Sequence, residues 1–79
     1  MEEVHYQCKP IFITVHAIKR AREKGIAYPD YVYHVLKAGK VERFGKNGMK
    51  FISKSKKPII CVGEDLGQCI IIKTIERGN

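Results

Sequence analysis

The stretch IICVGEDLGQCIIIKTIE, residues 59–76, decides the fold of this chain. Its two apolar runs, Ile59–Val62 and Cys69–Ile72, carry apolar side chains at both odd and even positions, and the Glu-Asp-Leu-Gly sequence between them is typical of a turn. Strands that are apolar on both sides are central strands of a sheet and are covered on both faces. The stretch therefore predicts two antiparallel strands, over 59–63 and 68–76, joined by a short turn.

Two further strands precede this pair. Residues 40–44 and 49–54 alternate in polarity, and Asn47-Gly48 between them is the signal of a tight hairpin turn. The Ser-Lys-Lys-Pro sequence at 55–58 then turns the chain into the strand that starts at residue 59. These signals predict an antiparallel meander that runs from residue 40 to residue 76.

Two helices are predicted before the strands, over 15–24 and 29–38. Thr14 can cap the first helix with its hydroxyl, and Gly25 after it suits the left-handed conformation in which helices end. Pro29 and Asp30 suit the first turn of the second helix, and Gly39 ends it. Apolar residues recur at helical spacing in both segments: Ala17, Ile18, Ala21, Val32, Val35 and Leu36.

This order of elements predicts an α+β fold, in which two N-terminal helices pack on one face of a four-stranded antiparallel sheet. At 79 residues the chain has room for one domain, 1–79, with residues 1–10 as a loose N-terminal segment and 11–13 as a short strand or an apolar staple. Two short helices cannot cover both faces of such a sheet. We therefore expect the other face to meet the N-terminal segment, a second subunit or a partner.

The positive charge is concentrated in one part of the sequence. The chain has 15 Lys and Arg against 8 Asp and Glu, a net charge of +7, and the segment from Lys37 to Lys57 holds eight cations and a single anion, Glu42. Such a segment favours RNA, DNA or another polyanion as partner, although lysines of this kind also serve solubility alone. The candidate nucleic-acid-binding residues are Lys40, Arg43, Lys46, Lys50, Lys54, Lys56 and Lys57.

The cysteines and the apolar runs bear on the compartment. Three cysteines, an odd number, argue against a disulfide framework and indicate a reducing, cytoplasmic location. A turn centred on residues 65–66 would place Cys61 and Cys69 on opposite faces of the sheet, whereas a shift of one residue would pair them. No apolar run approaches the roughly 20 residues of a membrane span, and the acidic start is unlike a signal peptide. We expect no metal and no cofactor, since the His5-x-x-Cys8 spacing lacks a second ligand pair.

Residues 14–76 resemble a known family. The pattern His16-Ala-x-x-Arg20-x-x-x-Lys24-Gly-Ile, followed by a second helix that ends in Leu36-x-x-Gly39, is similar to the signature HAxxRxxxRGI…LxxG of small bacterial, archaeal and phage domains of unknown function. These domains are grouped with the RelE-like, barnase/colicin-type fold of metal-independent toxin ribonucleases. The resemblance implies two helices on a curved antiparallel sheet, ribonuclease activity and an acidic antitoxin as partner. Lys24 departs from the signature, because it replaces an arginine and its planar, two-pronged donor.

The chemistry of metal-free RNA cleavage assigns roles to these residues. Such cleavage needs a base, an acid and cations that stabilise the charge on the phosphate. His16 is the candidate acid or base, since histidine ordinarily titrates near neutral pH. Arg20 and Lys24 follow at successive turns on the same helix face. On the last strand, Thr74 and Glu76 share one face with Lys73 on the other, and Glu76 is the carboxylate that could act as base.

A purely structural role for the same residues stays open. His16 could pack at the start of the helix, with a hydrogen bond to a loop carbonyl or to Thr74, while Arg20 pairs with Glu23 or Glu76. The sequence thus leaves three functions, in this order: a toxin-like metal-independent endoribonuclease, a non-catalytic nucleic-acid-binding module, and a protein-association domain or homodimer that uses the uncovered sheet face.

Overall fold

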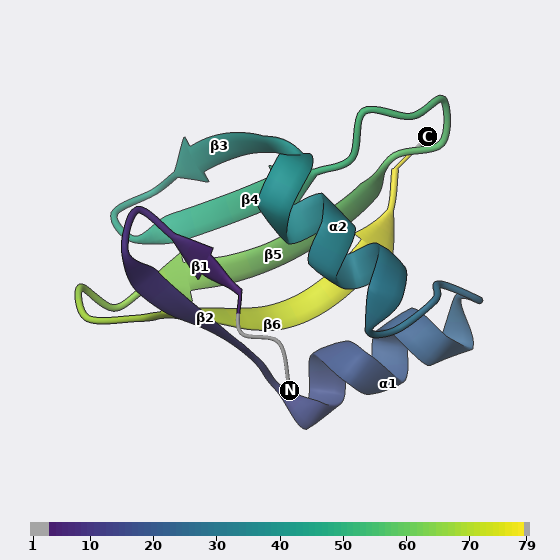
Figure 1. Ribbon diagram of the computed structural model, residues 1–79, viewed down its shortest axis with the longest axis horizontal. Coiled ribbons are helices and arrows are strands. Elements are labelled where there is room, and N and C mark those ends of the chain that lie inside the picture. Colours follow the sequence, from purple (N-terminus) through teal and green to yellow (C-terminus); the bar gives the residue numbers. More distant parts are fainter. Residues whose placement is uncertain (1–3, 79) are drawn as a thin grey trace.

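The computed structural model describes residues 4–78. Two helices and a curved sheet make up this part of the chain (Figure 1). The elements in order are β1 (His5–Tyr6), β2 (Lys9–Ile13), α1 (Val15–Glu23), α2 (Asp30–Ala38), β3 (Lys40–Phe44), β4 (Gly48–Ile52), β5 (Ile59–Asp65) and β6 (Ile70–Arg77).

The sheet has six strands and is mixed. Its order is β1-β2-β6-β5-β4-β3, and every neighbouring pair is antiparallel except β2 and β6, which run parallel with Ile11 opposite Ile70. The prediction of a four-stranded antiparallel sheet is therefore wrong, although the α+β class and the meander from β3 to β6 are present. The central position of β5 and β6 agrees with their apolar residues at both parities.

The two additional strands come from residues 5–13, of which 5–10 were expected to be loose and 11–13 to form a short strand or an apolar staple. Residues 7 and 8 form the turn between β1 and β2, and Gln7 and Cys8 both have positive φ, 51° and 66°. Turns of this kind normally carry Asn or Gly, so the sequence gives no hairpin signal here. Strand β2 pairs with β1 on one side and with β6 on the other, where Ile11, Phe12 and Ile13 lie opposite residues 70–72.

Helix α1 has the ends that the sequence predicts. The Thr14 hydroxyl accepts a hydrogen bond from the Ala17 N–H at 3.1 Å, which caps the first turn. At the other end Gly25 has φ +70°, and the Ile26 N–H donates to the Ala21 carbonyl at 2.9 Å, the long hydrogen bond of a Schellman motif. The helix lies beside the second half of β6, where β2 has ended (Figure 1).

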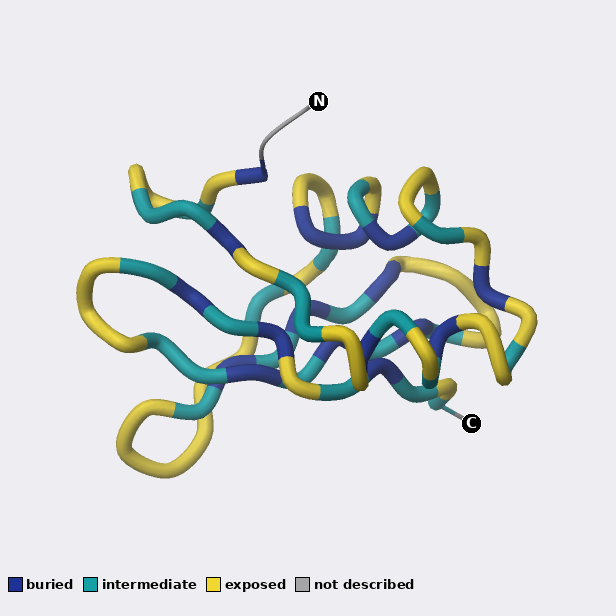
Figure 2. The backbone as a smooth tube through the Cα atoms, turned by 90° about the horizontal axis from the view of Figure 1, so that it is seen from below, coloured by how far each residue is buried: buried dark blue, intermediate teal, exposed yellow. Residues whose placement is uncertain are grey.

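Helix α2 crosses the sheet and closes the core. Its apolar stripe, Val32, Val35 and Leu36, is buried against β4 and β5. From the sheet, Met49, Phe51 and Cys61 and the inward residues of β6 are fully buried against the helices. Figure 2 shows these buried stretches in the middle of the strands and exposed loops between the strands. The chain thus covers one face of its sheet with helices.

The hairpin between β3 and β4 differs from the tight Asn-Gly turn that was predicted. Gly48 is not a turn residue; it is the first residue of β4 and pairs with Phe44. The positive φ lies instead at Gly45, +58°. A Cβ atom at Gly48 would lie 2.5 Å from the Phe44 ring, so this glycine makes room for the ring of its cross-strand partner. The predicted hairpin is therefore present, but Gly48 accommodates the Phe44 ring and takes no part in the turn.

A β-bulge changes the direction of one side chain. Val62 pairs with Thr74 and Gly63 pairs with Ile72, which leaves Lys73 as an extra residue on β6. Lys73 reaches Glu64, on the face that the helices do not cover, so its predicted placement opposite Thr74 and Glu76 is wrong. The register also places Cys61 opposite Ile75 and Cys69 before β6, and both thiols are free. Burial raises the pKa of the Cys61 thiol to about 12.

Candidate active site on the open sheet face

Four of the five residues predicted for catalysis lie together around one carboxylate. Arg20 Nη2 is 3.0 Å from Glu76 Oε1, and Lys24 Nζ is 3.2 Å from Glu76 Oε2. The Thr74 hydroxyl donates to Glu76 Oε1 at 3.1 Å. Helix α1 brings its two cations here because it runs alongside the end of β6 that carries Thr74 and Glu76. We call Arg20, Lys24, Thr74 and Glu76 the Glu76 cluster.

The cluster is accessible to solvent and strongly ionic. The side chains of Arg20 and Glu76 are each 37% exposed. The hydrogen bond from Arg20, followed by those from Lys24 and Thr74, lowers the pKa of the Glu76 carboxyl to about 2. Glu76 is therefore ionised at neutral pH. Arg20 also lies 3.7 Å from Glu23, so it pairs with both Glu23 and Glu76, where a structural role required only one of them.

His16, the fifth residue, lies next to this cluster without joining it. It precedes Arg20 by four residues on α1, a rise of about 6 Å along the helix axis, so the two side chains project from one helix face. The His16 side chain is exposed, and within residues 4–78 it makes no hydrogen bond to the Glu76 cluster. Its position leaves the imidazole available to a molecule that contacts Arg20.

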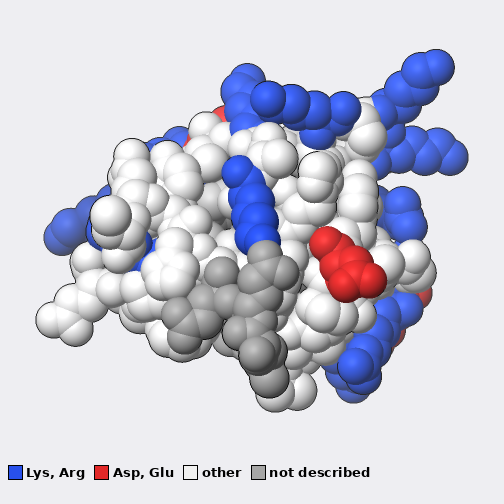
Figure 3. Space-filling model, in the orientation of Figure 1, with Lys and Arg blue, Asp and Glu red and all other residues white. Residues whose placement is uncertain are grey.

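The seven basic residues predicted to bind nucleic acid do not form one patch. They fall into two groups along β4. Lys54, Lys56 and Lys57 lie in the β4–β5 loop, where Lys40 starts β3; Lys46 lies in the β3–β4 turn, and Arg43 and Lys50 lie on the two strands of that hairpin. Figure 3 shows Lys and Arg along the upper margin of the molecule and over α1, with few charges in the middle of that face.

Local acids neutralise part of this charge. Lys40 pairs with Glu42 at 3.4 Å, and Arg43 pairs with Asp65 at 3.3 Å. Lys50 lies over the Phe44 ring, 5.2 Å from its centre. In the described part of the chain Lys46, Lys54, Lys56 and Lys57 make no ion pair, and all four are exposed. The loop group therefore has the more available charge.

Asp65 is a second ionic centre that the sequence reasoning did not identify. The Lys9 ammonium is 2.8 Å from Asp65 Oδ2, and the Gly67 N–H donates to Oδ1 at 2.8 Å. The hydrogen bond from Lys9, then that from Gly67, lowers the pKa of Asp65 to about 2. Lys9 belongs to β2 and Asp65 ends β5, so this cluster ties the N-terminal strands to the meander. The sequence reasoning missed it because Lys9 falls in the segment, residues 1–10, that was expected to be loose.

The face of the sheet that α2 does not cover carries apolar side chains. Ile52, Ile60, Val62 and Ile71 alternate with the buried residues of their strands and are half-buried. Phe12 and Phe44 are 56% and 43% exposed. Thr74 pairs with Val62 and Glu76 with Ile60, so the Glu76 cluster borders this open face. The N-terminal segment extends the sheet at its edge instead of covering this face, contrary to one of the expectations.

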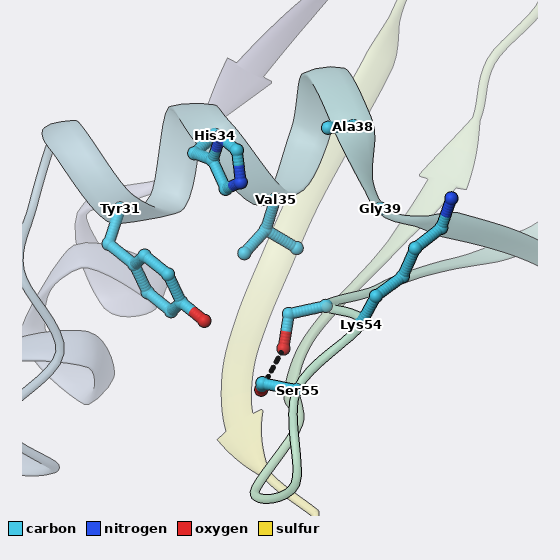
Figure 4. A pocket seen from close by; sticks show the side chains of 8 residues that line it. Tyr31, His34, Val35, Ala38, Gly39, Lys54 and Ser55 are labelled. Atoms are coloured by element: carbon cyan, nitrogen blue, oxygen red, sulfur yellow. Dashed lines mark hydrogen bonds between the residues drawn. The ribbon is translucent and has the colours of Figure 1, made fainter.

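A pocket between α2 and the β4–β5 loop was also missed. Its volume is about 250 Å³, and its walls include Tyr31, His34, Val35, Lys54 and Ser55. Figure 4 shows the two rings on the helix side and the lysine and serine on the loop side, with Val35 between them. His34 was not among the predicted site residues. The spacing of Tyr31 and His34, three residues apart on one helix face, was the available signal.

No protein-family model, curated protein or solved structure matches this chain. The resemblance of residues 14–76 to the HAxxRxxxRGI family, and the toxin-ribonuclease fold that it implies, therefore stay predictions. Within residues 4–78 no group of three His, Cys, Asp or Glu side chains is arranged to hold a metal ion. Neither helix of the described chain is long and apolar enough to cross a membrane.

Proposed function

We propose that this protein is a metal-independent endoribonuclease whose active site is the Glu76 cluster together with His16. The observation that carries the proposal is the convergence of Arg20 and Lys24 on one solvent-accessible carboxylate, at 3.0 and 3.2 Å, beside an exposed histidine. Two fixed cations and a group that exchanges protons are the components that RNA cleavage requires when no metal takes part.

The depressed pKa of Glu76 decides its role. General acid–base catalysis is most efficient when the catalytic pKa lies near the working pH, so a carboxylate with a pKa of about 2 is a weak base. We therefore assign Glu76 as a positioning residue that holds the two cations at one place. The guanidinium of Arg20 has five N–H donors, and those not taken by Glu76 can hold a phosphate oxygen.

His16 is left as the residue that transfers a proton. A phosphate held by Arg20 would lie about one helical turn from the imidazole, close enough for the ribose next to that phosphate to meet it. The 2′-hydroxyl then loses its proton to the imidazole and attacks phosphorus, and the bond to the 5′-oxygen breaks as that oxygen takes a proton from solvent water, which leaves a 2′,3′-cyclic phosphate and a 5′-hydroxyl. Charge on the phosphate oxygens is stabilised by Arg20 and Lys24.

The loop lysines support RNA as the substrate. Ile59 pairs with Arg77 and follows the β4–β5 loop, so Lys54, Lys56 and Lys57 lie at the same end of the sheet as Glu76. A strand of RNA can thus contact these lysines and the Glu76 cluster together. A cytoplasmic location belongs to this proposal and rests on the odd number of cysteines.

Cleavage of a 5′-labelled RNA in the presence of a metal chelator tests the proposal. The wild type should cleave, and His16→Gln should reduce cleavage at saturating RNA by about 10²–10⁴, the usual contribution of acid–base catalysis. Arg20→Lys should also reduce it, whereas Arg22→Lys, an exposed control on the same helix, should not. All variants should keep the wild-type melting temperature.

Two results would contradict parts of the proposal. Absence of cleavage by the wild type, with RNA retained, would reduce the function to non-catalytic nucleic-acid binding. Cleavage that survives His16→Gln would keep the activity and discard this site.

Protein association is a second candidate, and the open sheet face favours it. The half-buried Ile52, Ile60 and Val62, with Phe12 and Phe44 exposed beside them, form an apolar surface without cover in the described chain. An acidic antitoxin seated there would also contact the Glu76 cluster, and a second copy would form a homodimer. Light scattering tests the homodimer: Phe12→Asp should convert a wild-type dimer to a monomer, and a monomeric wild type would exclude it.

A further inference from the structure

We propose that the pocket between α2 and the β4–β5 loop binds one nucleotide unit, either as a free nucleoside monophosphate or within an RNA strand. The base would stack on the Tyr31–His34 ring pair, and the phosphate would contact the Lys54 ammonium on the loop side. As a place where the RNA strand is held, this site rests on the proposed function. As a mononucleotide site it can be tested separately.

The ring pair provides the surface for a base. The Tyr31 and His34 rings are stacked, with centres 6.2 Å apart and planes 22° from parallel, and His34 is exposed. Every base has a flat face, so stacking on an aromatic side chain accepts any of them. Both rings lie on the side of α2 that lines the pocket (Figure 4).

The opposite wall is cationic and hydroxyl-bearing. Lys54 and Ser55 line the pocket, Lys56 and Lys57 follow in the same loop, and none of the lining residues is acidic. The phosphate belongs on this side, because the other polar boundary of the pocket is the C-terminal end of α2, at Ala38 and Gly39. The last carbonyls of a helix repel anions and favour N–H donors, such as those on the edge of a base.

The loop wall is held in shape before any ligand arrives. The buried Ser53 hydroxyl accepts a hydrogen bond from the Ile59 N–H at 2.8 Å and lies 3.0 Å from the Ser55 hydroxyl. Ser55 in turn donates to the Lys57 carbonyl at 3.1 Å. A preformed wall lowers the entropic cost of binding.

The size of the pocket limits the ligand. Its volume of about 250 Å³ is slightly below the range of roughly 300–1,000 Å³ that is common for pockets of drug-sized ligands. One nucleotide unit is therefore the appropriate size, and a dinucleotide would extend out of the pocket toward Lys56 and Lys57. Such an extension leads along the loop to the end of the sheet that carries Glu76.

A titration followed by ¹H–¹⁵N NMR tests the site, with AMP, inorganic phosphate and an eight-residue RNA as probes. AMP should shift the amide signals of Tyr31, His34 and Ser55, and phosphate alone should act only on the loop. His34→Ala should weaken AMP binding by about five- to 150-fold, the range of one base–aromatic stacking contact. Lys54→Gln should also weaken it. Lys46→Gln, an exposed lysine at the other end of the sheet, is the control and should not.

The outcomes separate this site from the proposed function. AMP shifts confined to lysines outside the pocket, no response at millimolar AMP, or equal losses in Lys54→Gln and Lys46→Gln would each overturn the nucleotide site. Retention and cleavage of RNA by His34→Ala at wild-type affinity would overturn its part in RNA binding while leaving the Glu76 cluster intact. AMP binding in the pocket without any RNA binding would keep the mononucleotide site and contradict the ribonuclease.

Discussion

The separation of the basic residues by β4 leads to a prediction about which lysines bind RNA. Two triple variants remove the same charge at opposite ends of the sheet. The loop variant replaces Lys54, Lys56 and Lys57 by glutamine, and the hairpin variant replaces Arg43, Lys46 and Lys50 by glutamine. Lys50, the member of the hairpin group nearest to the loop, lies four residues from Lys54, about 13 Å at 3.3 Å per residue. This distance exceeds the Debye length of about 8 Å at physiological ionic strength, so the groups act on RNA almost independently.

The expected size follows from counterion release. Each phosphate contact to a single strand contributes about −0.7 to the slope of log K against log salt concentration. Loss of the three loop lysines, none of which is ion-paired within the described residues, should reduce the magnitude of the slope by about 2. If the variant and the wild type bind RNA equally at 1 M salt, this change of slope makes the variant bind about 50-fold more weakly than the wild type at 0.15 M salt. The hairpin variant should lose less than about fivefold, because Arg43 pairs with Asp65 and Lys50 lies over the Phe44 ring, which leaves Lys46 as the cation of this group without a partner in the described residues.

Fluorescence anisotropy with a labelled single-stranded RNA, repeated between 50 and 300 mM salt, measures both quantities. Equal losses in the two variants would mean that RNA responds only to the total charge, and the reasoning from position would be refuted. Unchanged affinity and slope in both would show that the lysines serve solubility. Melting temperatures of both variants provide the control for folding.

Three further predictions concern stability. The pKa values of Glu76 and Asp65 are held at about 2, below their ordinary values of 4.5 and 3.8; the stability that these carboxylates contribute is thus present above those values and is lost as the pH falls toward 2. Melting temperatures between pH 6 and pH 2 should show this loss, and a profile equally steep in Glu76→Gln would exclude Glu76 as its source. Gly63→Ala should destabilise the fold by about 1–3 kcal/mol in urea titrations, since its Cβ would lie 2.1 Å from the Ile71 carbonyl oxygen; a wild-type midpoint would contradict that contact. The double change Gln7→Asn and Cys8→Gly should raise the free energy of unfolding by about 1 kcal/mol, because both positions have positive φ, and a loss of stability would argue against the turn between β1 and β2.

The elements that the sequence predicts correctly are those specified by neighbouring residues. Thr14 caps α1 through an N–H three residues away, and Gly25 ends the helix through bonds to its last turn. The parallel pairing of β2 with β6 depends on residues at the two ends of the chain, and no local pattern encodes it. The Asn47-Gly48 signal predicted the hairpin but the wrong turn residues for a related reason. The ring of Phe44, across the hairpin, occupies the space that a side chain at Gly48 would need.

The same distinction applies to the functional residues. The Glu76 cluster was predictable because helical spacing aligns Arg20 with Lys24 and strand alternation aligns Thr74 with Glu76, so only one tertiary contact had to be guessed. The pocket at Tyr31 and His34 exists because the β4–β5 loop packs against α2. No residue pattern in either segment predicts this packing. Strand alternation placed Lys73 on the face opposite Thr74, but the bulge at Lys73 interrupts the alternation, so this prediction was wrong.

The pairing of β2 with β6 has a consequence for how this protein is made. On the ribosome, β2 emerges well before its partner strand, because Ile11 pairs with Ile70, which is 59 residues later in the chain. Until β6 is complete, the nascent chain exposes Ile11 and Ile13 with no sheet to join. Contacts between residues so far apart in sequence slow folding and expose apolar segments to aggregation. The pairing can therefore form only after β6 has left the ribosome, and removal of either β2 or β6 would leave the other without this partner.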